Sequence, residues 1–342
     1  MIDPDEATLQ LRRAWADVQT GVSEPMSGGF WASMHRVRVT GQPDGVPAEV
    51  VVRFAPHSMM GAKEAEVQRA VAGQGFATPR VWLSYPDAVR DGWWSVMDFC
   101  SGPPLLSDLD GVAVLRGAPR LYRSVPNQLA VTMAALHRLN PQPITSAVRR
   151  AAPDVAWSVP DVLAGIRSDA ADVGRTDVVA AVDRLGATRP QPERKVVCHG
   201  DLHPLNILDA DGGPVVLDWT GAVHAEPAYD VAFTELLLAN PPIALPRSTA
   251  AAVRFAGRLL ARRFIAAYAR ANPDVSLANV GWFRALHSAR VIVDVTALRA
   301  RHGPDAGGHP WRFMAPIAAT SLAAATGVGL QGFGPAGSEI DV

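Results

Sequence analysis

The sequence predicts an α+β chain in which a small β-rich N-terminal part precedes a larger, mainly helical C-terminal part. The first observation is a set of β-branched or alternating runs of strand type at 34–39, 49–54 and 93–99. The second is a pair of long helical segments near the other end, at 248–271 and 277–301. Segregation of strands and helices along a chain is typical of the α+β class.

Composition limits the class of protein. The 342 residues suit one large two-lobed unit or two domains, and 48% hydrophobic with 19% charged residues indicates a soluble, folded chain. A net charge of −1 gives no case for nucleic acid or an anionic membrane as partner. Cys100 and Cys198 lie in or beside apolar runs, which favours buried free thiols over a disulfide.

We expect a cytoplasmic location, because free thiols suit a reducing compartment and the acidic start MIDPDEATLQ is no signal peptide. The uncharged stretch between Arg312 and Glu339 is rich in Ala, Gly, Ser and Thr and contains Pro316 and Pro335. A membrane-spanning helix needs about 20 predominantly apolar residues. The stretch therefore predicts a small-residue helix followed by a loose tail, not a membrane span.

The N-terminal elements alternate between helix and strand. Residues 5–18 have an approximate apolar face and predict a short helix. The strands at 34–39 and 49–54 are separated by a turn at 41–47, and 63–72 predicts the next helix.

Further elements follow along the chain. A strand begins at 78–81, the helix predicted at 127–140 has a stripe of leucine and methionine, and short helices are expected at 158–166 and 176–185.

The most informative stretch is VVCHGDLHPLNILDADGGPVVLDWTG, residues 196–221. Its Asp-Gly-Gly turn between β-branched runs predicts a hairpin, which would bring Asn206 and Asp218 together with Asp201 beside them. Mg²⁺ prefers oxygen ligands and usually takes one or two carboxylates plus substrate phosphates. Asp218 and Asn206 are therefore candidate Mg²⁺ ligands, and Asp201 remains as a base for a hydroxyl group.

The spacing matches the kinase catalytic loop H-R-D-L-x-x-x-N, with Gly200 in place of Arg, and Asp218-Trp219-Thr220 stands where D-F-G would be. HGDLHPLNIL followed by VLDWTG resembles the aminoglycoside phosphotransferase and choline kinase-like family. The resemblance implies a protein-kinase-like fold, with a five-stranded, nucleotide-covering N-lobe over 1–100. The C-lobe, 101–342, would hold the catalytic loop, the metal site and the acceptor site. It also implies transfer of the γ-phosphoryl group of ATP or GTP to a hydroxyl of a small molecule.

The resemblance assigns further roles in phosphate binding. Arg53 stands where kinases place a phosphate-binding Lys, and Arg can fork onto phosphate oxygens. Glu64 is its expected partner, with Glu66 as the substitute, because adjacent helix positions point about 100° apart and only one can face the cleft.

Two backbone segments are implied to contact the nucleotide. The backbone at Ser27, Gly28 and Gly29 would cover the phosphates, and the segment containing Asp98, Phe99 and Cys100 would hold adenine. Asp230 is expected to support the catalytic loop by hydrogen bonds, and His137 to be a packing residue.

Two other interpretations remain open. The Arg in place of Lys suggests a catalytically silent nucleotide-binding module, although Asp201, Asn206 and Asp218 argue against it. A zinc-dependent hydrolase would use His199, Asp201 and His203, but no further Cys/His cluster supports it.

The charge of the C-terminal part indicates which class of acceptor it would bind. Downstream of Asp230 arginines outnumber acids, which favours a neutral or anionic acceptor over a polycationic aminoglycoside.

Overall fold

The computed structural model describes most of the chain: residues 2–26, 32–106, 111–243 and 247–332. These residues form two compact units. The sheet unit comprises Met1–Leu109, Leu139–Val155 and Pro204–Ala222. The helical unit comprises Asp110–Arg138, Ala156–His203 and Val223–Val342.

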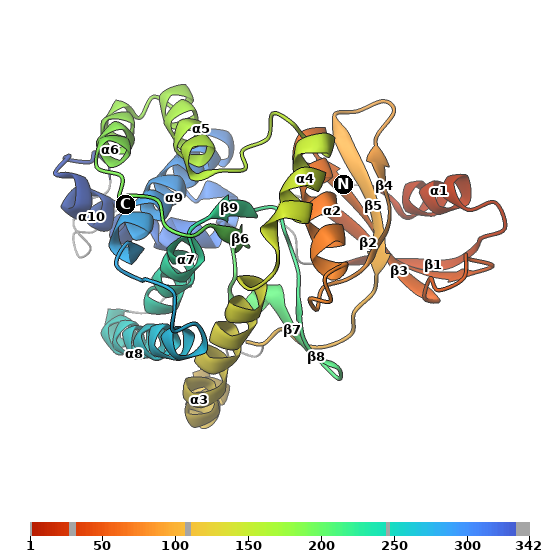
Figure 1. The fold of residues 1–342 in the computed structure, drawn as a ribbon, viewed down its shortest axis with the longest axis horizontal. Helices are drawn as coiled ribbons and strands as arrows, with labels where there is room; N and C mark the ends of the chain where they lie inside the picture. Colours follow the sequence, from red (N-terminus) through yellow and green to blue (C-terminus); the bar gives the residue numbers. More distant parts are fainter. Residues whose placement is uncertain (1, 27–31, 107–110, 244–246, 333–342) are drawn as a thin grey trace. The chain divides into compact units, whose positions relative to one another are not determined.

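The sheet unit is built on a five-stranded antiparallel sheet with the order β1-β2-β3-β5-β4 (Figure 1). The strands are β1 Gln19–Met26, β2 Ser33–Thr40, β3 Glu49–Pro56, β4 Val81–Pro86 and β5 Gly92–Asp98. The predicted five-stranded N-terminal part is therefore confirmed. The predicted helix at 5–18 is too long, because α1 ends at Ala14 and Trp15 adopts an extended conformation.

Alternation along β3 sends neighbouring side chains to opposite faces of the sheet. Val50 and Val52 lie in one apolar cluster with Leu11 of α1 (Pro4–Ala14). Val51 belongs to a different cluster, and Arg53 pairs with a residue of α2 (Ser58–Ala72). The pleat of β3 thus directs a charged side chain toward α2.

The two edge strands interrupt their pairing. The register shifts between Thr20 and Ser23 in β1, and between Val81 and Leu83 in β4. The inner pairings of β2 with β3 and of β3 with β5 run in continuous register. Each edge strand also contains a proline.

The predicted hairpin is present in the sheet unit. Strand β7, Ile207–Ala210, pairs with β8, Gly213–Val216, after the short 3₁₀ helix η1, Pro204–Asn206. Thr78 anchors it, because its hydroxyl donates to the Val216 carbonyl at 2.8 Å and accepts from Trp219 Nε1 at 2.9 Å. Helix α4, Pro141–Ala151, also belongs to this unit and packs against α2.

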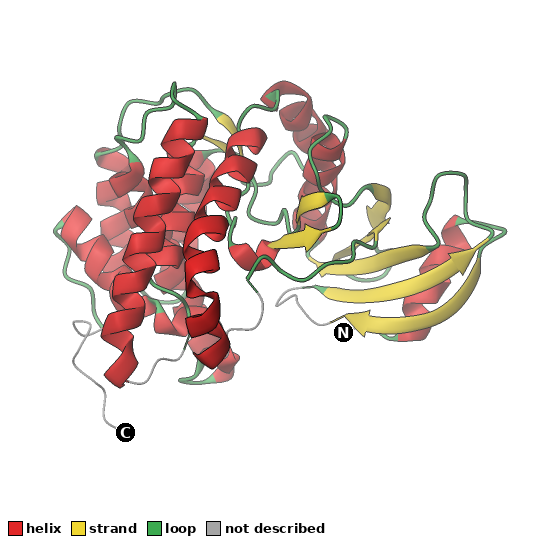
Figure 2. Ribbon diagram, turned by 90° about the horizontal axis from the view of Figure 1, so that it is seen from below, coloured by secondary structure: helices red, strands yellow, loops and turns green. Residues whose placement is uncertain are grey.

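Helices form most of the other unit, as Figure 2 shows in red. They are α3 Gly111–Leu136, α5 Val159–Asp172, α6 Thr176–Ala187, α7 Ala228–Ala239, α8 Arg247–Ala271, α9 Val280–His302 and α10 Ala315–Thr326, with the 3₁₀ segments η2 Ala306–Gly308 and η3 Pro310–Phe313. Strands β6, Val196–Cys198, and β9, Val223–Ala225, pair beside them. Within the described ranges, no helix has both the length and the hydrophobicity needed to cross a membrane.

Candidate active site

Arg53 and Glu64 form a buried ion pair in the sheet unit. Burial disfavours the charge on Arg53, but the carboxylates of Glu64 and Asp218 together raise the pKa of its guanidinium group, so Arg53 stays cationic. Glu66 is engaged elsewhere, with Arg69 of its own helix. The structure thus brings Arg53, Glu64 and Asp218 into one charged cluster.

Asp218 lies just after β8, in a left-handed backbone conformation with φ of 62°. Asp tolerates this region better than most residues do. Its Oδ1 atom accepts hydrogen bonds from the Thr220 backbone N–H at 3.3 Å and the Thr220 hydroxyl at 2.5 Å. These local bonds fix the direction of the carboxylate.

Asn206 reaches the same end of the hairpin, because the Leu217 N–H donates to the Asn206 carbonyl at 2.9 Å. An amide oxygen and a carboxylate are the kind of donors that Mg²⁺ accepts. The residues present therefore fit a hard divalent cation.

Lys63 is a residue that the sequence did not single out as functional. It is buried on α2, next to Glu64, and its ammonium group donates to the Ala222 carbonyl at 3.2 Å. This bond ties the segment that follows Asp218 to the helix that carries Glu64.

In the helical unit, Asp230 of α7 holds the backbone that leads to Asp201. Its two oxygens accept hydrogen bonds from the His199 N–H at 2.8 Å and the Gly200 N–H at 2.7 Å. The Nε2 atom of His137 lies 3.0 Å from Asp230 Oδ2, and His137 Nδ1 lies 2.7 Å from the Tyr268 hydroxyl. Desolvation opposes ionisation of Asp230, but these partners lower its pKa, so the carboxylate is charged.

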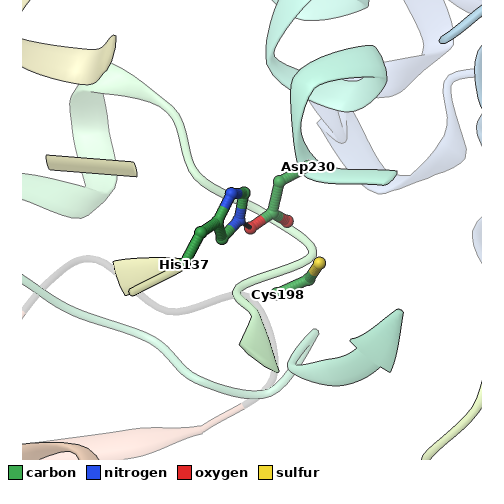
Figure 3. A group of neighbouring side chains, drawn as sticks. All are labelled: His137, Cys198 and Asp230. Carbon is green, nitrogen blue, oxygen red and sulfur yellow. Dashed lines mark hydrogen bonds and ion pairs between the residues drawn. The ribbon is translucent and has the colours of Figure 1, made fainter. Parts of the chain in front are cut away.

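Among the described residues, the His, Cys and carboxylate side chains close enough to share a metal ion are those of His137, Cys198 and Asp230. Figure 3 shows the His137 ring turned toward the Asp230 carboxylate, with Cys198 beside them. Burial raises the pKa of Cys198 well above its usual value, so the sulfur is a neutral thiol facing the carbonyls of Ala225 and Glu226. Hydrogen bonds already occupy the other two residues, which makes this group a structural network, not a metal site.

Asp201 follows this network in the chain. Its N–H donates to His199 Nδ1 at 3.3 Å, and its Oδ1 atom lies 3.6 Å from His203 Nε2. Asp201 belongs to the helical unit, whereas Arg53, Glu64, Asn206 and Asp218 belong to the sheet unit.

The remaining predicted residues belong to the two backbone segments that were expected to contact the nucleotide. Ser27, Gly28 and Gly29 lie outside the described residues. Asp98 ends β5, and its carboxylate accepts from the Arg80 N–H at 2.9 Å and from Trp82 Nε1 at 2.7 Å. Its side chain is thus committed to the sheet.

Phe99 and Cys100 follow Asp98. The Phe99 ring lies 4.1 Å from the Arg36 guanidinium, and the Cys100 side chain is half-buried.

Two charged residues of α9, Arg290 and Asp294, were also not singled out from the sequence as part of the site. Arg290 lies among buried apolar residues and donates to the Gly200 carbonyl at 3.1 Å. Burial, together with the charges of Asp169 and Asp201 and against the effect of Arg290, raises the pKa of Asp294 to about 6. The available signal was an Arg–Asp pair four residues apart within an apolar helix.

Residues 24–272 match the family model described as the phosphotransferase enzyme family, APH. No curated protein matches the chain.

Several solved structures share the fold. A candidate aminoglycoside phosphotransferase from Ralstonia eutropha JMP134 is 16% identical, with a TM-score of 0.63, covering 95% of this chain and 98% of that one. Macrolide 2'-phosphotransferase from Brachybacterium faecium is 19% identical, with a TM-score of 0.54 and coverage of 92% and 97%.

A thermostable mutant of an aminoglycoside phosphotransferase, in ternary complex with AMP-PNP and hygromycin B, is 16% identical. Its TM-score is 0.59, and the match covers 94% of this chain and 99% of that chain. These likenesses confirm the predicted protein-kinase-like fold.

Proposed function

Because the chain belongs to the APH phosphotransferase enzyme family, we propose that it transfers the γ-phosphoryl group of ATP, or of GTP, to a hydroxyl group of a small molecule. In this proposal residues 1–100 cover the nucleotide. Residues 101–342 supply the catalytic loop, the metal ligands and the acceptor site.

One observation carries the proposal: Arg53, Glu64 and Asp218 interact as a single charged cluster, with Asn206 at the same hairpin end as Asp218. A buried cation that is paired with Glu64 and lies near oxygen donors for a metal suits the phosphates of a nucleotide. Phosphoryl transfer depends mainly on positioning and on neutralising charge.

Each residue of the sheet unit then has a role. Arg53 binds phosphate oxygens through its planar guanidinium group, and Glu64 holds that group in direction. Asn206 and Asp218 hold Mg²⁺, which when bound would neutralise phosphate charge. The backbone at Ser27, Gly28 and Gly29 closes over the phosphates, and the segment with Asp98, Phe99 and Cys100 holds the base.

Asp201 is the proposed catalytic base. It orients the acceptor hydroxyl and takes its proton as the oxygen attacks the γ-phosphorus and the bond to the leaving nucleoside diphosphate breaks. The hydrogen bonds of Asp230 support this role, because they fix the two residues that precede Asp201.

We propose a neutral or anionic acceptor. The support is the excess of arginine over acidic residues downstream of Asp230. Around Asp201 itself the charges are of both signs, since the cation Arg290 and the acid Asp294 both interact electrostatically with Asp201. The acceptor panel below therefore includes cationic compounds as the direct alternative.

The experiment is steady-state phosphorylation of kanamycin-type aminoglycosides, macrolides, nucleosides and hydroxy acids, with ATP or GTP and Mg²⁺. We expect ATP- or GTP-dependent gain of one phosphoryl group on a neutral or anionic compound. Asp201→Asn should lower turnover by about 10²–10⁴-fold, the usual value of general-base assistance, with nucleotide affinity unchanged.

The outcomes separate the alternatives. Nucleotide binding without transfer to any acceptor would support the silent module. Activity that a zinc chelator abolishes, without nucleotide consumption, would support the hydrolase. Efficient turnover of aminoglycosides alone would contradict the proposed acceptor class but not phosphoryl transfer.

A further inference from the structure

Arg290 occupies an unusual place on α9. Helix α9 is mostly buried, and its neighbours Ala289 and Val291 are fully buried. Arg290 also reaches the interior, with its guanidinium 5.2 Å from the Phe233 ring centroid and 5.1 Å from that of Trp311. The two rings contact each other edge to face, with centroids 6.1 Å apart, and the guanidinium lies beside both of them. Aromatic rings attract a nearby cation, which helps to order the Arg290 side chain.

The polar contacts of this guanidinium point to the loop that carries Asp201. Its Nη1 atom donates to the Gly200 carbonyl at 3.1 Å, and its Nε atom lies 3.8 Å from Asp294 Oδ2. Tyr229 is a further hydrogen-bond partner of Arg290, and the negative charge of Asp201 also acts on the guanidinium. Burial disfavours the charge, but these partners raise the pKa of Arg290, so it stays cationic.

Gly200 is the residue directly before Asp201, and its φ of 74° is a conformation that favours glycine. Asp230 of α7 accepts the Gly200 N–H at 2.7 Å, while Arg290 of α9 holds the carbonyl of the same residue. On the other side of Asp201, the Thr234 hydroxyl donates to the Leu202 carbonyl at 2.6 Å. The backbone on both sides of Asp201 is therefore held, and Arg290 contributes a contact with α9.

We infer that Arg290 is a positioning residue that fixes the Gly200–Asp201 peptide and thereby the direction of the Asp201 carboxylate. The inference rests on the proposed function in taking Asp201 as the base. Arg290 acts through the peptide and takes no part in proton transfer. A misplacement of the base by about 1 Å can cost on the order of 10²-fold in rate, so such an anchor affects turnover more than ground-state binding.

The test compares Arg290→Met with Arg284→Met in the full chain. Arg284 is a matched control, since it lies on the same helix and its ion pair, with Glu235 at 2.7 Å, does not involve the loop. We expect Arg290→Met to lower kcat by about 10²-fold with KM for ATP unchanged, and Arg284→Met to leave both near wild type. Equal kcat in the two variants would overturn the inference.

Hydrogen exchange measured by mass spectrometry provides a readout that needs no activity. The amides of His199 and Gly200 should exchange faster in Arg290→Met than in the wild type or in Arg284→Met, because their loop has lost one anchor. Unchanged exchange there would overturn the inference even if kcat fell. A wild type that transfers phosphate to no acceptor would reject the proposed function, while the exchange comparison would still decide whether Arg290 anchors the loop.

Chemical rescue distinguishes anchoring from general stability. Arg290→Ala leaves a space beside Phe233 and Trp311, where the Arg290 guanidinium lay, and we expect a free guanidinium ion to enter it. Millimolar guanidinium chloride should restore part of kcat in this variant, and sodium chloride at equal ionic strength should not. Absence of rescue in a folded Arg290→Ala variant would contradict the inference. Arg290→Lys, which keeps the charge but loses the fork, replaces Arg290→Met if the latter does not fold, and the same loss of kcat and faster exchange are expected.

Discussion

Both units bury a carboxylate, but they neutralise it in different ways. In the sheet unit Glu64 faces a side-chain cation, Arg53, and the charge of Asp218 acts on both. In the helical unit Asp230 accepts hydrogen bonds from two backbone N–H groups and interacts with the His137 ring. The first cluster contains two acids and one cation, whereas the second surrounds one acid with donors.

The difference indicates different purposes. A carboxylate whose oxygens are taken by backbone donors fixes the chain and has little capacity left for a ligand. A cluster of charged side chains that pair with one another can exchange some of these interactions for bonds to phosphates and a metal ion. We therefore expect substitutions in the first cluster to lower turnover, with a loss of stability as well where a buried charge loses its partner. Substitutions in the second cluster should act mainly on stability.

The largest effect is expected for Asp218→Asn. Asn tolerates the left-handed backbone and can still accept the hydrogen bonds of Thr220, so the variant removes charge but not shape. Nucleotide turnover with Mg²⁺ should fall to background, while the midpoint of thermal unfolding stays near the wild-type value. Asp209→Asn, on the exposed side of β7 in the same hairpin, should keep full turnover. Near-wild-type turnover in Asp218→Asn would show that the metal assignment is wrong.

Arg53 tests the cationic half of the same cluster. Arg53→Lys should keep part of the activity, because it preserves the charge but not the fork. Arg53→Met should lose most of the activity and lower the free energy of unfolding by about 3–5 kcal/mol, since it leaves Glu64 buried without its cation.

The control for Arg53 is Arg38→Met, whose exposed pair with Glu49 should contribute little. Steady-state kinetics and urea denaturation measure both effects. If both Arg53 variants matched the wild type, Arg53 would have no part in phosphate binding.

Asp230→Asn tests the structural role of the buried carboxylate in the helical unit. The Asn amide would meet backbone N–H groups that need an acceptor, and each unsatisfied buried group costs about 1–3 kcal/mol. We expect a loss of this size in the free energy of unfolding from urea titration. The exposed pair of Asp183 with Arg167 supplies the control, since Asp183→Asn should change little. A stability equal to that of the control would refute the structural role.

The smallest effect concerns pH. His287 is buried between Tyr229 and Phe233, and its Nε2 donates to the Tyr229 carbonyl at 2.9 Å. Burial, with the charge of Arg290, lowers its pKa from 6.5 to about 3. The folded state therefore binds fewer protons than the unfolded state between these values. The contribution of His287 is fully present above pH 6.5 and is lost as the pH falls.

Below pH 6.5 this single group should lower the free energy of unfolding by about 1.4 kcal/mol per pH unit. Urea titrations between neutral and mildly acidic pH should show a shallower slope for His287→Gln than for the wild type. The exposed His302 provides the control variant, His302→Gln, which should keep the wild-type slope. Identical slopes in all three proteins would contradict the assignment.

Local patterns made much of the fold predictable. The hairpin was found because its turn chemistry is contained in a few adjacent residues, and β3 because its core-facing residues are β-branched. Strand β1 gave no such signal, since most of its side chains are exposed and Gly21 and Pro25 interrupt it. The helix predicted at 127–140 overlaps the end of the longer α3, which continues through Pro126 and ends at Leu136, so both predicted bounds were wrong.

The candidate site was predictable where side chains carry its chemistry. Arg53 and Glu64 were both named from sequence, and the structure brings them together. Arg290 was not, because its partner is a backbone carbonyl 90 residues away, and a carbonyl leaves no mark in the sequence. Lys63 was missed for the same reason, since it binds the carbonyl of Ala222.

The broken register of the edge strands has a consequence for self-association. A straight outer strand exposes a row of backbone donors and acceptors on which a second molecule can add its own strand. In β1 and β4 a register shift interrupts this row, and Pro25 and Pro86 each lack a backbone donor. The same irregularities that made β1 hard to predict thus guard the sheet against edge-to-edge aggregation.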